Sequence, residues 1–165
     1  MKARFLLAGC VSAAILTAAL IAADDAKKDA KDEIKLEGVK CVVNAKGDVK
    51  EKSFVEYKGA KVFFCCDNCP KKFSESPEKF STSANYQLVA THQFKQKKCP
   101  LSGQDIKEGT ELDVSGVEVA FCCNNCKGKV EKADGKKQIE LVFSDEAFDK
   151  AFKIKKDKED KEKKN

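Results

Sequence analysis

The stretch YKGAKVFFCCDNC, residues 57–69, occurs a second time as VSGVEVAFCCNNC at residues 114–126. At an offset of 57 residues the two stretches share a glycine, two apolar positions, an asparagine and three cysteines. A lone cysteine precedes each stretch, Cys41 in the first copy and Cys99 in the second. Self-similarity at a fixed period indicates a repeated structural unit. We therefore expect two copies of one unit, each with a single cysteine, 23 or 22 intervening residues and a Cys-Cys-x-x-Cys cluster.

Each copy predicts a β-hairpin that ends at its cysteine cluster. In the first copy Val55 and Tyr57 alternate with polar residues, which places one face of a strand inward. The alternation resumes at Val62 and Phe64 after a turn at Lys58-Gly59, a sequence suited to a tight hairpin tip. The corresponding residues of the second copy are Leu112, Val114, Ser115, Gly116, Val119 and Phe121.

A short helix is predicted directly after each cluster. In the first copy this helix carries Phe73, which is expected to face the hairpin, and it ends at the Ser76-Pro77 break. In the second copy it contains Gly128, which disfavours a helix by about 1 kcal/mol relative to alanine. Hairpins followed by helices predict the α+β class, with residues such as Phe63, Phe64 and Phe121 in the hairpin core.

Two segments outside the clusters are predicted to be extended. Residues 84–94, which connect the copies, are expected to form an extended linker. Near the C-terminus Ile139, Leu141 and Phe143 alternate with other residues and predict a strand. A helix capped by Ser144 is expected to follow that strand.

The cluster geometry favours a site for a soft metal ion. Cys65 and Cys69 are four residues apart, so a strand end and the first helical turn present both thiols on one face. The backbone N–H groups of a helix N-terminus stabilise thiolates at such a position. Cys41 precedes the hairpin and can fold back to the same point. Units of this size usually need a metal or disulfides for stability, and the cysteines can supply either.

These features resemble the TRASH/YHS group of small metal-binding domains, which is related to treble-clef zinc proteins of the ribosome. The resemblance covers residues 38–82 and 96–133 and rests on the lone cysteine, the Tyr57-x-Gly59 hairpin tip and FFCC leading into the helix, with CPLSG and FCCNNC in the second copy. It implies two treble-clef-like units, each a β-hairpin followed by a short helix, that bind, sense or deliver heavy metals. The metal ligands that the resemblance implies are Cys41, Cys65 and Cys69 in the first unit and Cys99, Cys122 and Cys126 in the second.

The second cysteine of each doublet, Cys66 or Cys123, is a further candidate ligand. Adjacent residues that leave a strand face opposite sides, so both members of a doublet reach one metal only where the backbone turns between them. We expect Cys65 and Cys122 to contribute more to binding than their neighbours. Zinc sites usually have four ligands, whereas sets of three thiolates also suit copper(I), and both metals remain open.

Two other interpretations of the cysteines remain. Eight cysteines in an exported chain could form four disulfides and make a stapled interaction module without metal. The Cys-x-x-Cys pair formed by Cys66 and Cys69 could also act as a thiol redox pair. His92 is the single histidine and is expected on the surface, away from either cluster. No Ser/His/Asp or paired-carboxylate set can be assembled, so we expect no enzymatic activity.

The N-terminus resembles a cleavable secretory signal. A basic start precedes an uncharged run from Phe5 to Ala23 and then Asp24-Asp25, which predicts export to the periplasm or cell surface. A retained membrane anchor is the first alternative, and a lipoprotein processed at Cys10 is the second. An exported metal carrier would have its metal ion as ligand and a metal-transport or membrane protein as partner.

Charge argues against a nucleic-acid partner. The chain of 165 residues has a net charge of +5, but the excess lies in the signal and in the mixed-sign Lys-rich C-terminus, not on the folded part.

The predicted organisation is a signal peptide (1–23), a charged spacer (24–37), unit 1 (38–84), a linker (85–98), unit 2 (99–152) and a charged tail expected to be disordered (153–165).

Overall fold

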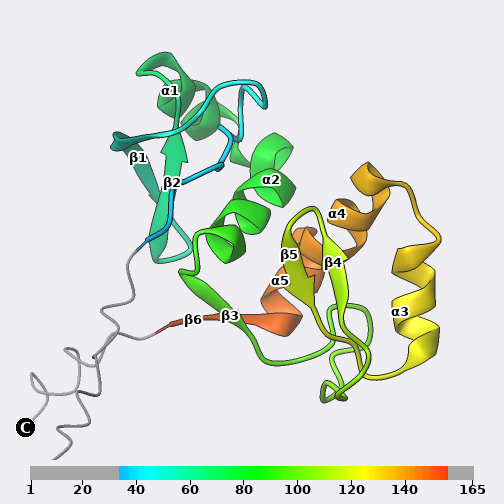
Figure 1. Cartoon of the computed structure of the whole chain (residues 1–165). Helices are drawn as coiled ribbons and strands as arrows, with labels where there is room; N and C mark the ends of the chain where they lie inside the picture. Colours follow the sequence, from blue (N-terminus) through cyan, green and yellow to red (C-terminus); the bar gives the residue numbers. More distant parts are fainter. Residues whose placement is uncertain (1–33, 156–165) are drawn as a thin grey trace, which may run out of the picture. The chain divides into compact units, whose positions relative to one another are not determined.

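Hairpin, helices and a short strand follow one another twice along residues 34–155, the part of the chain that the computed structural model describes (Figure 1). The predicted signal peptide and most of the charged spacer and tail lie outside these residues. The combination of antiparallel hairpins and helices confirms the α+β class. Within residues 34–155, no helix has the length and apolar character needed to cross a membrane.

The hairpin of the first copy consists of β1 (Lys50–Tyr57) and β2 (Ala60–Phe64), which pair antiparallel. Its tip is Lys58-Gly59, as predicted, and both residues have positive φ angles of 51° and 80°. Positive φ at both central positions is the mark of a type I′ turn, whose twist matches that of the strands it joins.

The second hairpin, formed by β4 (Leu112–Val114) and β5 (Val117–Val119), is shorter but has the same tip geometry. Ser115 and Gly116 have φ angles of 56° and 88°. The predicted tips are therefore confirmed in both copies.

Two helices follow the first hairpin, α1 (Asn68–Glu75) and α2 (Pro77–Ala90), and β3 (Phe94–Gln96) follows them. Phe73 of α1 packs against the hairpin as predicted, with its ring 5.5 Å from that of Tyr57 and 5.5 Å from that of Phe64. Pro77 occupies the first turn of α2, where its missing N–H costs no hydrogen bond, and so separates the two helices.

The extended linker predicted for residues 84–94 is wrong over most of its length, because residues 84–90 belong to α2. Ala84 and Leu88, one helical turn apart, are both fully buried. The helix is therefore stabilised chiefly by tertiary packing of this face, which sequence periodicity alone did not reveal.

The second copy continues with α3 (Asn124–Glu131), α4 (Gly135–Phe143), α5 (Asp145–Ala151) and β6 (Phe152–Ile154). Helix α3 forms despite Gly128, which lies within it.

The strand predicted through Ile139, Leu141 and Phe143 is wrong, because these residues form α4. The side chain of Asp134 accepts a hydrogen bond from the backbone N–H of Lys137 and caps this helix. Ile139, with Val142 and Phe143 three and four residues later, makes the apolar face, and the last two are fully buried. Ser144 precedes α5 as predicted, although its side chain makes no capping hydrogen bond.

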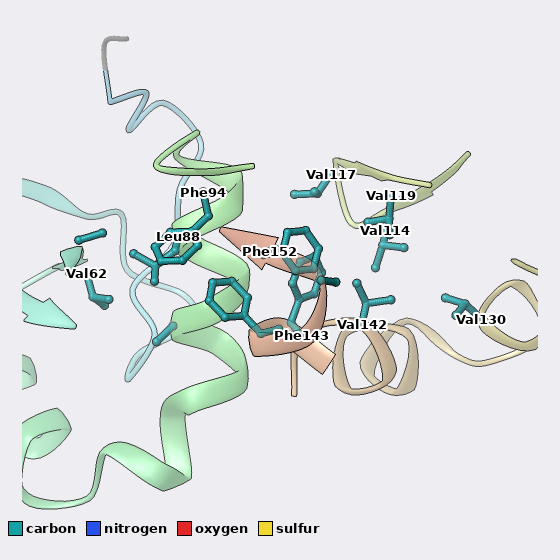
Figure 2. Packing of buried hydrophobic residues seen from close by; sticks show 14 of the residues in the cluster. Val62, Leu88, Phe94, Val114, Val117, Val119, Val130, Val142, Phe143 and Phe152 are labelled. Atoms are coloured by element: carbon teal, nitrogen blue, oxygen red, sulfur yellow. The ribbon is translucent and has the colours of Figure 1, made fainter. Parts of the chain in front are cut away.

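Both copies share one hydrophobic core (Figure 2). Strands β3 and β6, one from each copy, pair antiparallel, with Phe94 opposite Ile154. The Phe143 and Phe152 rings stack with their centroids 5.6 Å apart. The ring centroid of Phe148 lies 4.8 Å from that of Phe94 and 5.4 Å from that of Phe152. Figure 2 shows Phe143 and Phe152 between Leu88 of α2 and Val142 of α4. One core therefore supports the two cysteine clusters.

Candidate metal centres

The first cluster brings together Cys41, Cys65 and Cys69, whose sulfur atoms all lie within 4.8 Å of one another. Cys65 directly follows β2, and Cys69 is the second residue of α1. Their sulfur atoms are 3.8 Å apart. Cys41 and Cys69 are buried and Cys65 is half-buried, so the cluster lies at the margin of the core.

The second cluster is formed in the same way by Cys99, Cys122 and Cys126, again with all sulfur atoms within 4.8 Å. The sulfur atoms of Cys122 and Cys126 are 3.7 Å apart. Cys99 is fully buried, and the other two are half-buried. The structure therefore brings together the three cysteines of each triad predicted from the sequence.

The sulfur spacing matches a tetrahedral metal site. A Zn–S bond is about 2.3 Å long, which places two sulfur ligands about 3.8 Å apart at the edge of a tetrahedron. The separations of 3.8 Å and 3.7 Å have this value. All eight described cysteines are free thiols, so each triad can supply its sulfur atoms to an ion.

A tight turn presents the lone cysteine of the first copy. The backbone N–H of Cys41 donates to the carbonyl of Gly47 at 2.9 Å. Lys40 and Asp48 close the base of this turn through a backbone bridge and an ion pair. The turn holds Cys41 against the end of the hairpin.

The equivalent turn of the second copy is one residue shorter. Here the N–H of Cys99 donates to Gln104 at 2.8 Å, and Lys98 and Asp105 make the closing bridge and ion pair. The repeat offset is 58 residues at the lone cysteine and 57 at the cluster because the first copy has one extra residue within this turn.

Gly47 is required for the close approach of this turn to the first cluster. A Cβ atom at Gly47 would lie 2.8 Å from the Cβ and 2.9 Å from the sulfur of Cys65. Contacts this short are repulsive, and the atoms that would have to move belong to the cluster itself. Gly47 is not apparent from the repeat, because the second copy has Gln104 at the corresponding place.

Polar side chains at matching positions of the two turns contact the second cysteine of each triad. The Ser102 hydroxyl lies 3.2 Å from the Cys122 sulfur. In the first copy the Asn44 amide donates to Cys65 over a longer 3.9 Å. Neither residue was expected at the site from the sequence.

A buried glutamine joins the two cysteine-bearing segments in the first copy. The amide of Gln87, from α2, accepts from the backbone N–H of Phe63 at 2.7 Å. It donates to the carbonyls of Phe63 and Lys40, each at 3.0 Å. One side chain thus connects the residue before Cys41 with the strand that leads to Cys65.

Gln96 makes the same three bonds in the second copy. It accepts from the N–H of Ala120 at 2.9 Å and donates to the carbonyls of Ala120 and Lys98 at 2.6 Å and 2.9 Å. Gln87 follows its cysteine cluster in the chain, whereas Gln96 precedes its own. A search for repeated sequence therefore could not pair them.

Hydrogen bonding favours a thiolate at the lone cysteine of each triad. Burial alone would raise the pKa of Cys99, but the Ser102 hydroxyl and backbone N–H groups, including that of Cys122, lower it to about 7. The pKa of Cys41 is also lowered, because the backbone N–H groups of neighbours such as Asn44 outweigh its burial.

The last cysteine of each triad has the opposite tendency. Burial, followed by hydrogen bonding with the Cys122 and Cys123 thiols, raises the pKa of Cys126 to about 12. Burial and the neighbouring thiols, first that of Cys66, also raise the pKa of Cys69. Without metal the clustered sulfurs must share protons, and a cation at their centre would replace those protons.

Other residues considered from the sequence lie where they were expected. His92 is exposed and belongs to neither triad. Phe63, Phe64 and Phe121 are buried, as predicted for hairpin core residues.

No protein-family model, no curated protein and no solved structure matches the chain. The functional assignment therefore rests on the two cysteine clusters.

Proposed function

We propose that this is an exported, non-enzymatic protein that binds two thiophilic metal ions, zinc or copper(I), one at each cysteine triad. The observation that supports it most directly is the convergence of both triads, with sulfur separations of 3.8 Å and 3.7 Å. Thiolate ligands favour soft and borderline metals, which include zinc and copper(I). The resemblance of both copies to treble-clef-like TRASH/YHS domains adds support, and the role we infer is metal sensing, delivery or storage.

Export is part of this proposal and is supported by the sequence of residues 1–23, a basic start followed by an uncharged apolar run. A periplasmic or cell-surface metal carrier would pass its ion to, or receive it from, a metal-transport or membrane partner. N-terminal sequencing of the protein from its native compartment tests this part, with Ala23 or Asp24 expected as the first residue. Recovery of an intact Met1 would contradict export, whereas a lipid on Cys10, detected by intact mass, would contradict cleavage at Ala23 or Asp24 and indicate an exported lipoprotein.

The competing function is a disulfide-stapled interaction module. It draws on the same cysteines, since each thiol of a triad lies near two others. In the metal form, alkylation should be blocked until a chelator is added, after which at least three thiols per copy become reactive without reductant. In the disulfide form, the chelator releases none, and reductant is required. Thiol counting on protein purified from its native compartment under anaerobic conditions therefore separates the two functions.

A further inference from the structure

Each triad has a fourth thiol beside it. In the first copy the sulfur of Cys66 lies 3.3 Å from that of Cys69, and its thiol also interacts with that of Cys65. The backbone N–H of Cys69 donates to the Cys66 carbonyl at 3.2 Å, so Cys66 adjoins the first turn of α1. Cys66 is half-buried, and its sulfur is in direct contact with that of Cys69.

The second copy also has a fourth thiol beside its triad. The sulfur of Cys123 lies 3.7 Å from that of Cys122, and its thiol interacts with that of Cys126. The backbone N–H of Lys127 donates to the Cys123 carbonyl at 3.1 Å, so Cys123 directly precedes the first turn of α3. The extra thiol thus contacts a triad sulfur in both copies, that of Cys69 in the first and that of Cys122 in the second.

The backbone turns at each doublet, which removes the objection that adjacent residues face opposite sides. Strand β2 ends at Phe64, and the bend that follows contains both Cys65 and Cys66. Strand β5 ends at Val119, and Cys122 and Cys123 lie in a bend before α3. Alternation along a strand therefore does not govern the direction of either pair.

We propose that Cys66 and Cys123 are the fourth ligands, so that each copy forms a closed four-thiolate site for a tetrahedral divalent cation of the zinc class. This rests on the proposed metal-binding function and specifies its cargo. When the ion binds, the four thiols release their protons to solvent and form four metal–sulfur bonds, and no electron is transferred. The completed site has a net charge of −2, which the N–H groups at the start of α1 or α3 help to stabilise.

Cobalt(II) is a suitable probe, because it takes tetrahedral thiolate sites and its sulfur-to-metal charge-transfer absorption grows with the number of coordinated thiolates. The full-length reduced protein is loaded anaerobically, and the absorption is divided by the bound cobalt measured on the same sample. The comparison includes wild type, Cys66→Ser, Cys123→Ser and the double variant. Cys65→Ser is the matched control that removes an established member of a triad.

With four thiolates at each of two sites, either single variant should lose about one-eighth of the charge-transfer intensity per bound cobalt, and the double variant about one-quarter. Zinc should also displace cobalt from every variant. Zinc should bind more weakly to a site where a thiolate is missing. Unchanged intensity in Cys66→Ser and Cys123→Ser, alongside a loss in Cys65→Ser, would overturn the fourth-ligand proposal and leave the triads as metal sites. A wild-type protein that binds neither cobalt nor zinc would overturn both. Cys66→Ala and Cys123→Ala should reproduce the serine results, which excludes an effect of the new hydroxyl.

Discussion

At the residue scale, the first site depends on the absence of a side chain at Gly47. Gly47 brings the turn that carries Cys41 against the sulfur of Cys65, with no room for a Cβ atom. Gly47 does not have a positive φ angle. Steric contact, and not backbone conformation, therefore requires glycine here. The cluster therefore depends on a residue that itself contributes no ligand.

We expect Gly47→Ala to weaken metal binding at the first site by about ten- to hundredfold, because the new methyl group displaces Cys65 from the cluster. Binding at the second site should be unchanged and serves as an internal reference. Gly128→Ala is the matched control, since a Cβ atom there meets open space within helix α3. Competition with a chromophoric chelator measures both affinities, and equal affinities at the two sites of Gly47→Ala would contradict the steric account.

At the element scale, the site depends on two segments of each copy being held together, and a glutamine side chain does this in both. Gln87 connects Lys40, the residue before Cys41, with β2, and Gln96 connects Lys98, the residue before Cys99, with the end of the second hairpin. Each amide satisfies backbone groups at the edge of a hairpin as a third strand would.

Gln87→Leu should lower the free energy of unfolding by about 1–3 kcal/mol, because it leaves the buried N–H and carbonyl of Phe63 and the partly buried carbonyl of Lys40 without their partner. It should also weaken the first metal site more than the second, whereas Gln96→Leu should have the opposite preference. Gln138→Leu, at a half-buried position of α4, is the control and should change little. Denaturant unfolding and site-resolved metal titration test this, and equal effects of Gln87→Leu and Gln138→Leu would count against it.

Repetition made the hairpins and the triads predictable, because matching cysteines, tip residues and alternating apolar positions occur twice at a fixed offset. The helical structure around Leu88 and Ile139 could not be predicted from repetition. Leu88 belongs to a helix formed mainly through tertiary contacts, and Ile139, Leu141 and Phe143 alternate within a helical segment. The roles of Gln87 and Gln96 were not predicted, because Gln87 follows its cysteine cluster in the chain whereas Gln96 precedes its own.

At the scale of the whole molecule, a polar network joins the first hairpin tip to helix α5 of the second copy. Lys58 pairs with Asp145 at 3.0 Å and with Asp149 at 2.6 Å. Tyr57 and Asn85 also donate to Asp145, at 3.2 Å and 3.0 Å. The network complements the shared aromatic core and links the stability of one copy to that of the other.

The network predicts a loss of stability in acid. Burial alone would raise the pKa of Asp145, but hydrogen bonds from Asn85 and Lys58 outweigh it and lower that pKa from 3.8 to about 2. Since the folded pKa is the lower one, the stabilisation is present above about pH 4 and is lost as the pH falls towards 2.

Lys58→Met should therefore lower the melting temperature by a few degrees at pH 6, a modest effect because Asp145 is about half exposed and the pair is screened by water. The difference from wild type should shrink as the pH approaches 2. Lys150→Met, which removes an exposed pair with Glu146 within α5, should have a smaller effect at pH 6. A Lys58→Met difference that stays constant between pH 6 and pH 2 would contradict this account.

The proposed function requires that each of the two cysteine triads holds one metal ion. Native mass spectrometry of the full-length protein, reduced and loaded anaerobically with zinc, tests it most directly. The account predicts two ions in wild type, one in the Cys41→Ser/Cys65→Ser variant, one in the Cys99→Ser/Cys122→Ser variant and none when all four substitutions are combined. A wild-type protein that stays folded without binding zinc, or triad variants that still bind two ions, would contradict it.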